Sequence, residues 1–359
     1  MSRLWVLCEE PADYANTLVV EVFMPMGASV AWRFPGSRAS SRRLPAGTAL
    51  EELPWWRRLR LLARALATHD VFILNGYAAV THWMFFVLNA VFFRKSVGLA
   101  TDTQADSTFP RGSGKPSYLR TTLKRRLLGW LFRRDWIWGL PCGTGPHVDF
   151  FKKFGMSAEH IHTFPMVVDE RSYRRRFPRP GDGIFRFGYV GRLEPHKRIK
   201  LALAAFRRYA ASGKTEFHII GEGRERQTLE AEFGSVPGVR FLGPLYGDEK
   251  VAALQRLDCL VLVSDYEPWG LVVNEALTAG IPVIVSECVG ARMDLVEGTA
   301  ATGIVVPPDD EVALAAAMSK MYGNDEARAR FAESATRRMM IWGLSQARLS
   351  LENWLGKVK

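Results

Sequence analysis

The chain has 359 residues, of which 48% are hydrophobic and 24% charged, and its formal net charge is +11. This length predicts two domains rather than one small module, and the apolar content excludes a mainly disordered chain. The four cysteines lie far apart without a CxxC pair, which excludes a disulfide scaffold or a zinc ribbon and favours a reducing compartment. The positive charge points to an anionic partner, which would be nucleic acid, lipid head groups or a phosphorylated substrate.

The first half of the chain predicts a series of short strands. Glu9 and Glu10 interrupt the amino terminus where a secretory signal needs a continuous apolar core, so we expect no signal peptide and a cytoplasmic protein. The candidate strands are Leu4–Leu7, Ser29–Trp32, Val71–Leu74, Ser96–Ala100, Trp136–Trp138 and Ile161–Phe164.

The run Val71–Phe93 holds 23 residues without a charge and is long enough to span a bilayer. Asn75 and Gly76 resemble a turn, and Thr81, His82 and Asn89 interrupt the remainder. We therefore expect a buried strand followed by a buried or interfacial helix, with a membrane span as the alternative.

The second half alternates strands and helices, which predicts a parallel sheet covered on both faces. The expected strands are Phe185–Val190, Phe217–Ile220, Val239–Leu242, Cys259–Val263 and Pro282–Ser286, and the expected helices are Leu201–Ala211, Glu225–Glu232, Glu249–Arg256 and Val272–Ala279. The predicted class is α/β with two doubly wound, Rossmann-like domains. The domains are expected over residues 1–168 and 184–335, joined by a polar linker over 169–183 that is rich in Pro and Gly. Residues 336–359 are expected to form a helix that packs back on the amino-terminal domain.

Two groups of polar residues follow strands of the second half. Gly191 ends the first strand and permits a sharp turn, after which Arg192 and Lys197 can converge on one anion, although a solvated basic loop has the same composition. Glu267 lies in the loop after Cys259–Val263, and Glu275 lies in the next helix. The start of that helix, at Gly270, Leu271 and Val272, offers unpaired N–H groups to an anion, and a neighbouring carboxylate suits sugar hydroxyls.

These motifs resemble the carboxyl-terminal domain of retaining glycosyltransferases of family 4, the glycosyl transferases group 1, which have the GT-B architecture of two doubly wound domains facing a cleft. The resemblance covers roughly Phe185–Met318 and rests on four motifs in order, which begin at Gly191, Phe217, Val239 and Glu267 and are followed by Gly280-Ile281-Pro282. It implies a hexosyltransferase whose Arg192 and Lys197 hold the diphosphate of the donor. Glu267, Trp269 and the amides of Gly270 to Val272 would hold the sugar and the distal phosphate, and Glu275 would hold the ribose.

The amino-terminal half departs from the family in two places. Cys8-Glu9-Glu10-Pro11 stands where members often have a glycine-rich loop, and Asp102 stands near the position of a histidine. Asp102 is the candidate for orienting the acceptor hydroxyl or the donor sugar, and a turn cap is the alternative.

The sequence gives no sign of a metal site or a dinucleotide site. No DxD pair occurs, no histidine has ligand spacing, and Gly221-Glu222-Gly223 lacks the third glycine of the dinucleotide fingerprint. We expect a metal-independent site without a cofactor, in which the nucleotide sugar is a co-substrate.

The segment Arg111–Arg134 has eight basic residues and no acid, with leucines at helical spacing and Trp130 beside them. This pattern predicts a helix on an anionic membrane surface, with a solvated helix packed on its own domain as the alternative and nucleic acid excluded for lack of a motif. The predicted protein is a peripheral enzyme on the inner face of the cell membrane. It would act on a lipid-linked or membrane-proximal glycan acceptor in polysaccharide biosynthesis. A nucleotide-sugar epimerase, a phosphorylase or a non-catalytic, membrane-recruited binding module are the alternatives.

Overall fold

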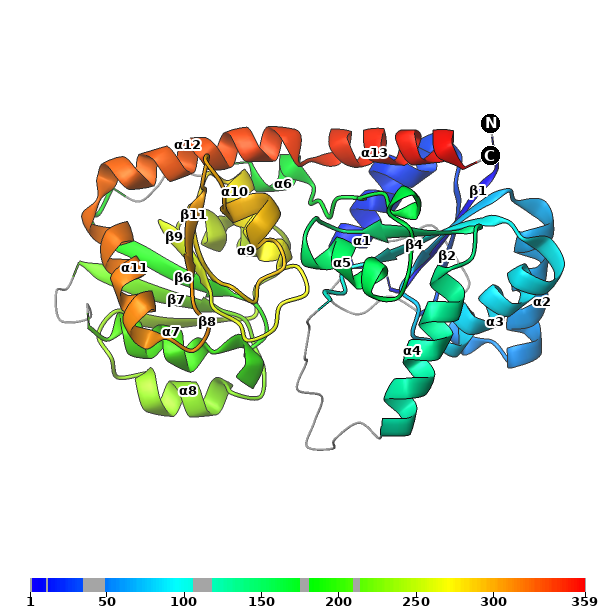
Figure 1. Ribbon diagram of the computed structural model, residues 1–359. Helices are drawn as coiled ribbons and strands as arrows, with labels where there is room; N and C mark the ends of the chain where they lie inside the picture. Colours follow the sequence, from blue (N-terminus) through cyan, green and yellow to red (C-terminus); the bar gives the residue numbers. More distant parts are fainter. Residues whose placement is uncertain are drawn as a thin grey trace. The chain divides into compact units, whose positions relative to one another are not determined.

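A computed structural model describes residues 2–10, 12–34, 49–105, 118–174, 181–208 and 214–358. The chain divides into two compact units (Figure 1). Unit 1 comprises Met1–Val167 together with Leu344–Lys359, and unit 2 comprises Val168–Gly343.

Unit 1 is built on a parallel five-stranded sheet in the order β2-β1-β3-β4-β5. Its strands are β1 (Leu4–Cys8), β2 (Ser29–Trp32), β3 (Val71–Asn75), β4 (Ser96–Thr101) and β5 (Ile137–Pro141). Its helices are α1 (Asp13–Leu18), η1 (Val19–Phe23), η2 (Met24–Met26), η3 (Leu50–Glu52), α2 (Trp55–Thr68), α3 (Val80–Leu88), η4 (Asn89–Phe93), α4 (Tyr118–Phe132), α5 (Pro146–Lys153), η5 (Ala158–His160) and α13 (Leu344–Lys357).

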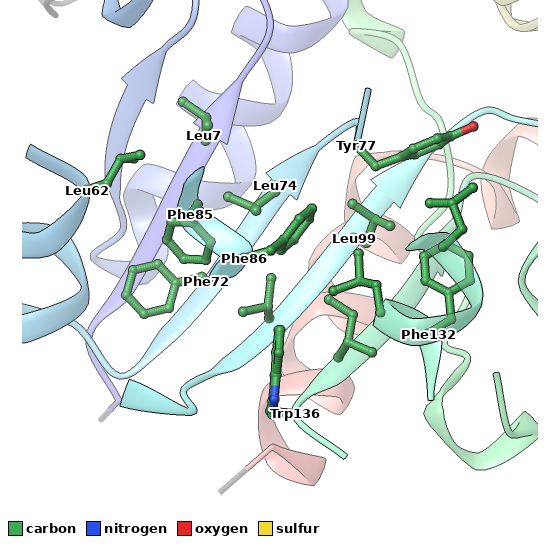
Figure 2. Close-up of a cluster of buried hydrophobic side chains, with 14 of the residues drawn as sticks. Leu7, Leu62, Phe72, Leu74, Tyr77, Phe85, Phe86, Leu99, Phe132 and Trp136 are labelled. Carbon is green, nitrogen blue, oxygen red and sulfur yellow. The ribbon is translucent and has the colours of Figure 1, made fainter. Parts of the chain in front are cut away.

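One face of this sheet carries an aromatic core (Figure 2). Phe72 of β3 packs against Phe85 of α3 at a ring-centroid distance of 5.1 Å, and α4 contributes Phe132. The other side of the sheet receives α13, whose Trp354 lies against Gly98 of β4. A Cβ atom at Gly98 would lie 2.8 Å from the Trp354 ring, so this contact depends on the missing side chain.

Unit 2 is built on a parallel six-stranded sheet in the order β11-β10-β9-β6-β7-β8. Its strands are β6 (Phe185–Val190), β7 (Thr215–Ile220), β8 (Val239–Gly243), β9 (Cys259–Leu262), β10 (Val283–Ser286) and β11 (Gly303–Val306). Its helices are α6 (Glu170–Tyr173), η6 (Pro195–Lys197), α7 (Ile199–Phe206), α8 (Arg226–Phe233), α9 (Gly247–Gln255), α10 (Leu271–Thr278), η8 (Arg292–Val296), α11 (Glu311–Gly323) and α12 (Asp325–Ile341). Two doubly wound α/β units confirm the predicted fold class.

Three of the predicted segments form something other than the element expected, and the strand β11 was not predicted. Ile161–Phe164 is not a strand: it runs beside β5, and Phe164 N–H donates to the carbonyl of Pro141, but Pro141 has no N–H to return a ladder bond. The helix predicted over 336–359 is two helices, since α12 ends at Ile341 and α13 begins at Leu344. The stretch predicted as a linker over 169–183 contains the short helix α6, and its residues 175–180 lie outside the described residues.

Two predictions concerned membrane contact. The uncharged run Val71–Phe93 folds as β3, α3 and η4, as expected, and in the described part of the chain we find no helix with the length and apolarity needed to cross a bilayer. In the basic segment 111–134, residues 111–117 and the side chains of 118–124 lie outside the described residues. Of the apolar residues expected to face a membrane, Leu128, Leu131 and Phe132 are instead buried in unit 1, because the sheet needs a cover on this face, whereas Leu127 and Trp130 are exposed.

Candidate active site

The strand order of unit 2 reverses between β6 and β9, which are neighbours in the sheet although β7 and β8 separate them in the chain. Ligands of such sheets bind in the crevice outside the carboxyl ends of the strands at this point. Arg192 and Lys197 follow β6, and Glu267 follows β9. The sequence-predicted residues therefore converge on the position where a ligand site is expected.

Lys197 and Glu267 form an ion pair, in which the ammonium group donates to Oε2 of the carboxylate. Both side chains are largely buried, with exposed fractions of 12% and 14%. A contact across 70 residues of chain holds the cation and the carboxylate at one point in a partly desolvated environment.

The pKa shifts of two neighbouring side chains, His196 and Tyr189, indicate that Arg192 belongs to the same cluster of charges. The pKa of His196 is lowered by its burial and then by Lys197, and Glu267 and Arg192 also act on it. The pKa of Tyr189 is raised by burial and then by Glu267, while Arg192 lowers it. Arg192 and Glu267 therefore lie within electrostatic reach of both His196 and Tyr189, and Lys197 lies within reach of His196. His196 was missed as a site residue, because a histidine in a basic loop carries no spacing signal.

The loop that carries Arg192 is fixed to the end of β7 by its backbone. Gly191 N–H donates to Ile220 and Leu193 N–H donates to Glu222, at 3.0 and 2.8 Å. A Cβ atom at Gly221 would lie 1.8 Å from the carbonyl oxygen of Gly191, so the two loops can touch only because this residue is glycine. The loop is thereby held in place before any ligand arrives.

Helix α10 begins at the end of the loop that carries Glu267. Gly270, its N-cap, has φ 94°, a left-handed conformation that glycine adopts without strain. The first-turn amides of an α-helix have no acceptor within the helix, and they lie at the positive end of its dipole. Gly270, Leu271 and Val272 thus offer N–H groups to an anion at the end of the β9 loop.

The side chain of Trp269 does not line this site. Its ring is buried and stacks on Trp342 at 5.8 Å, and its indole N–H donates to Asn274 at 2.8 Å. Trp269 therefore supports the loop from beneath, and its backbone is the part that remains near a ligand.

Glu275 has partners of its own in α10. It is 7% exposed, and its Oε1 accepts hydrogen bonds from Tyr173 at 2.9 Å and from Lys250 at 2.7 Å. Its Oε2 is buried and has no protein partner among the described residues. The carboxylate therefore has the capacity to accept one more hydrogen bond. Tyr173 and Lys250 were missed because they lie 102 and 25 residues away in the chain.

Asp102 belongs to unit 1, where it directly follows β4. It lines a cavity of about 310 Å³ at the carboxyl ends of β1, β3 and β4, together with Glu9, Tyr14 and Asn75. The pKa of Tyr14 is raised to about 12, by burial and then by the charge of Asp102. The phenol is therefore neutral at pH 7 and both donates and accepts hydrogen bonds.

Glu9, which stands where a glycine-rich loop was expected, is part of an ion-pair network. Arg33 binds Glu9 and also Glu51, and Glu51 in turn binds Arg58. Burial raises the pKa of Glu9, and the hydrogen bond from Arg33 opposes this. The loop at this position therefore presents a carboxylate bound by Arg33, whereas a glycine-rich loop would present backbone N–H groups to a phosphate.

Sequence comparison finds relatives mainly of the carboxyl-terminal unit. Residues 171–338 match the family described as Glycosyl transferases group 1. The glycogen synthase of Mycobacterium tuberculosis is 31% identical over 204 residues, which are 56% of this chain and 49% of that protein. The phosphatidyl-myo-inositol mannosyltransferase of Mycolicibacterium smegmatis is 32% identical over 168 residues, 45% of this chain and 42% of that protein. The chain thus spans about half the length of these curated relatives.

The crystal structure of Anabaena HepE in complex with UDP superposes with a TM-score of 0.76 at 18% sequence identity, covering 99% of this chain and 100% of that chain. This likeness extends over both units and confirms the predicted GT-B fold.

Proposed function

Because unit 2 contains a domain of the glycosyl transferases group 1 family, over residues 171–338, we propose that the protein is a retaining hexosyltransferase of family 4. It would move a sugar from a nucleotide-diphosphate donor to a lipid-linked or membrane-proximal glycan acceptor. The observation that carries the proposal is the convergence of Arg192, Lys197 and Glu267 at the point where the sheet order reverses.

In this mechanism the bond between the sugar and the diphosphate loosens first, and negative charge develops on the leaving phosphate. Lys197, Arg192 and the amides at the start of α10 would stabilise that charge more strongly in the transition state than in the ground state. These groups supply the positive charge that a metal ion provides elsewhere, so the proposed reaction needs no metal. The departing phosphate oxygen would take the proton of the acceptor hydroxyl.

The remaining carboxylates would recognise the neutral parts of the donor. Glu267, oriented by Lys197, would accept hydrogen bonds from the transferred sugar, and Glu275 would accept one from the ribose. UDP in the complex of HepE is a nucleoside diphosphate of the kind proposed here.

The acceptor side is proposed to be the cavity of unit 1 that Asp102 lines. Its volume of about 310 Å³ is at the lower end of ligand pockets, which hold about 300 to 1,000 Å³, and suits one sugar ring. Asp102 would orient the acceptor hydroxyl.

A peripheral position on the inner face of the cell membrane is part of the proposal. Arg125, Arg126, Arg133 and Arg134 of the basic segment are exposed, and one relative is named for the lipid phosphatidyl-myo-inositol. Exposed arginines attract anionic head groups.

The test is a thermal-shift screen of the full chain against nucleoside diphosphate sugars in EDTA, followed by transfer assays with the donor that stabilises it. We expect transfer in EDTA with an α or β product of the same anomeric configuration as the donor, read by NMR. An inverted product would refute retention, and activity that requires a divalent cation would refute the metal-independent site. Donor turnover that needs no acceptor hydroxyl, or that uses inorganic phosphate, would show an epimerase or a phosphorylase instead.

A further inference from the structure

The continuous helix formed by α3 and η4 exposes apolar residues and buries polar ones. Val80, Val87, Val91 and Phe92 are 72%, 53%, 63% and 72% exposed. Thr81, His82 and Asn89 are fully buried in unit 1. A helix on a water-exposed surface has the opposite pattern, with polar residues outside.

The buried polar residues are held by unit 1. Thr81 donates to Glu51 at 2.8 Å and lies 3.4 Å from Arg58. Asn89 accepts from the N–H of Lys95 at 2.8 Å and donates to its carbonyl at 2.9 Å. The orientation of the helix is therefore fixed by hydrogen bonds on its inner side, and the apolar outer side is a stable feature of the fold.

Valines at positions 80, 87 and 91 recur one or two turns apart, so they form one stripe along the helix. We call Val80, Val87, Val91 and Phe92 the α3 stripe. Large exposed apolar residues are ordinary when scattered, but several on the outer side of one helix indicate an interaction surface.

Helix α2 packs beside α3 and η4 (Figure 1). It carries several exposed arginines. Arg57 and Arg60 lie over the ring of exposed Trp56, at 5.0 and 5.8 Å from its centroid. Arg64 is exposed on the same helix, and Arg94 is exposed at the end of η4.

Acidic residues are few in this part of the chain. Asp70 is the only one between Leu53 and Lys95, and it is bound by Arg3 and Lys95. Glu51 and Glu52 directly precede this stretch, and Glu51 is bound by Arg33 and Arg58. Apolar side chains beside arginines and tryptophans are the composition of a surface that enters the head-group region of an anionic bilayer.

We propose that the α3 stripe, flanked by the arginines of α2, docks unit 1 on an anionic lipid bilayer. Charge complementarity selects this occupant, because a second copy of the chain would bring the same arginines to a two-fold interface. The inference rests on the proposed function in one respect: an enzyme with a lipid-linked acceptor must bind at a membrane.

The proposal also separates two roles that the sequence placed on one helix. In α4, Leu128, Leu131 and Phe132 are buried in the core, while its arginines remain exposed together with Leu127 and Trp130, which are each 39% exposed. The basic segment can then supply attraction to lipid, and the α3 stripe supplies the apolar contact that salt does not screen.

The experiment is co-sedimentation of the full-length chain with vesicles of 30% phosphatidylglycerol and 70% phosphatidylcholine. The apolar variant is Val87→Ser, Val91→Ser and Phe92→Ser together. Its control is Val312→Ser, Met340→Ser and Ile341→Ser, which removes three equally exposed apolar residues from unit 2. The charge variant is Arg57→Gln, Arg60→Gln and Arg64→Gln, with Arg207→Gln, Arg256→Gln and Arg337→Gln as its control.

We expect the apolar variant to lose at least tenfold in vesicle partitioning at about 0.15 M salt, the physiological ionic strength, while its control binds like wild type. The charge variant should lose binding to anionic vesicles, and wild type should bind pure phosphatidylcholine weakly. Unchanged partitioning of the apolar variant would overturn the proposal. So would a wild-type dimer that the apolar variant converts to a monomer, since a second copy would then cover the stripe.

Each variant is also titrated with nucleoside diphosphates, whose proposed site is in unit 2. Unchanged nucleotide binding and an unchanged circular dichroism spectrum would show that the serine variant is folded. Vesicle binding by a wild-type protein that binds no nucleotide would refute the proposed function and leave the membrane surface standing.

Discussion

Lys197 is the side chain whose role the geometry defines most sharply, because its ammonium group is already held against Glu267 at the proposed phosphate position. We expect Lys197→Ala and Arg192→Ala each to slow sugar transfer by about 2 to 4 kcal/mol of barrier, the cost of losing one preorganised charge-stabilising group. The measurement is kcat at saturating donor. Lys200→Ala is the matched control, since Lys200 is an exposed lysine that pairs with Glu232 on the surface. Wild-type turnover in both site variants would remove the diphosphate assignment.

Glu267 and Glu275 have different protein partners, and this predicts different roles. Glu275→Gln removes the charge that Lys250 and Tyr173 orient, and should weaken binding of a plain nucleoside diphosphate. Glu267→Gln should spare that binding and impair binding of the complete donor, because its carboxylate would contact the sugar. Isothermal titration calorimetry of both variants with the nucleoside diphosphate and with the complete donor measures these affinities. If Glu267→Gln weakened diphosphate binding and Glu275→Gln spared it, the two roles would be exchanged.

Buried His82 is expected to make unit 1 sensitive to acid. Burial, and then the charge of Arg33, lower its pKa from 6.5 to about 4, while Glu51 opposes this and Glu9 lies 3.8 Å away. The unfolded chain therefore binds the proton more readily than the folded chain. The contribution of neutral His82 to the free energy of unfolding is fully present above about pH 6.5 and is lost as the pH falls toward 4.

A pKa difference of this size between the unfolded and the folded chain corresponds to about 3 kcal/mol of unfolding free energy. We expect the unfolding temperature of unit 1 to fall between pH 7 and pH 4.5, and His82→Gln to flatten this dependence whatever its effect at pH 7. His160→Gln, at a partly exposed histidine, should keep the wild-type slope. An unchanged slope in His82→Gln would assign the acid sensitivity to another group.

Helix α10 links local backbone geometry to donor binding. At Gly270, φ is 94°, and a Cβ atom would lie 3.1 Å from Leu262. Gly270→Ala should cost about 1 to 2 kcal/mol of stability and shift the first-turn amides, so nucleoside diphosphate affinity should fall.

Gly280→Ala is a matched control for this helix start. Gly280 lies just after the other end of α10 with φ 67°, so alanine is also strained there. We expect a comparable loss of stability with unchanged nucleotide affinity. Equal affinity losses in the two variants would show a general effect of destabilisation rather than a role for the helix start.

Most strands could be predicted because buried parallel strands are short apolar runs that end at turn residues. Phe185–Val190 and Ser29–Trp32 have the predicted bounds. Ile161–Phe164 is apolar only at its two ends, and its neighbour Pro141 cannot complete a ladder, a defect that depends on a partner distant in sequence. Gly303–Val306 was not predicted as a strand, although it pairs with β10.

The candidate site could be predicted where its residues follow strand ends and could not where they are brought in by tertiary contacts. Arg192, Lys197 and Glu267 each have a position relative to a strand, so their convergence follows from the topology. Tyr173 and Lys250 contact Glu275 from other helices, and no local sequence pattern predicts these contacts.

The chain as a whole carries its net charge of +11 for at least two purposes in this account. Basic residues of unit 2 would bind a diphosphate, and those of unit 1 would attract lipid. The two are separable, since nucleotide binding should survive the arginine replacements of α2.

Replacing Arg125, Arg126, Arg133 and Arg134 by Gln should likewise lower vesicle binding at about 0.15 M salt without changing nucleotide affinity. Sedimentation like wild type would show that the exposed arginines of α4 do not contribute.

The most direct test of the central claim is a calorimetric titration of the full chain with nucleoside diphosphates in EDTA, beside the matching monophosphates. We predict that at least one diphosphate binds without a metal ion. Its affinity should fall about tenfold or more when the second phosphate is missing or when Lys197 is replaced by Ala, whereas Lys200→Ala should bind like wild type. Binding that requires a divalent cation, or a Lys197→Ala variant that binds the diphosphate as tightly as wild type, would contradict the account.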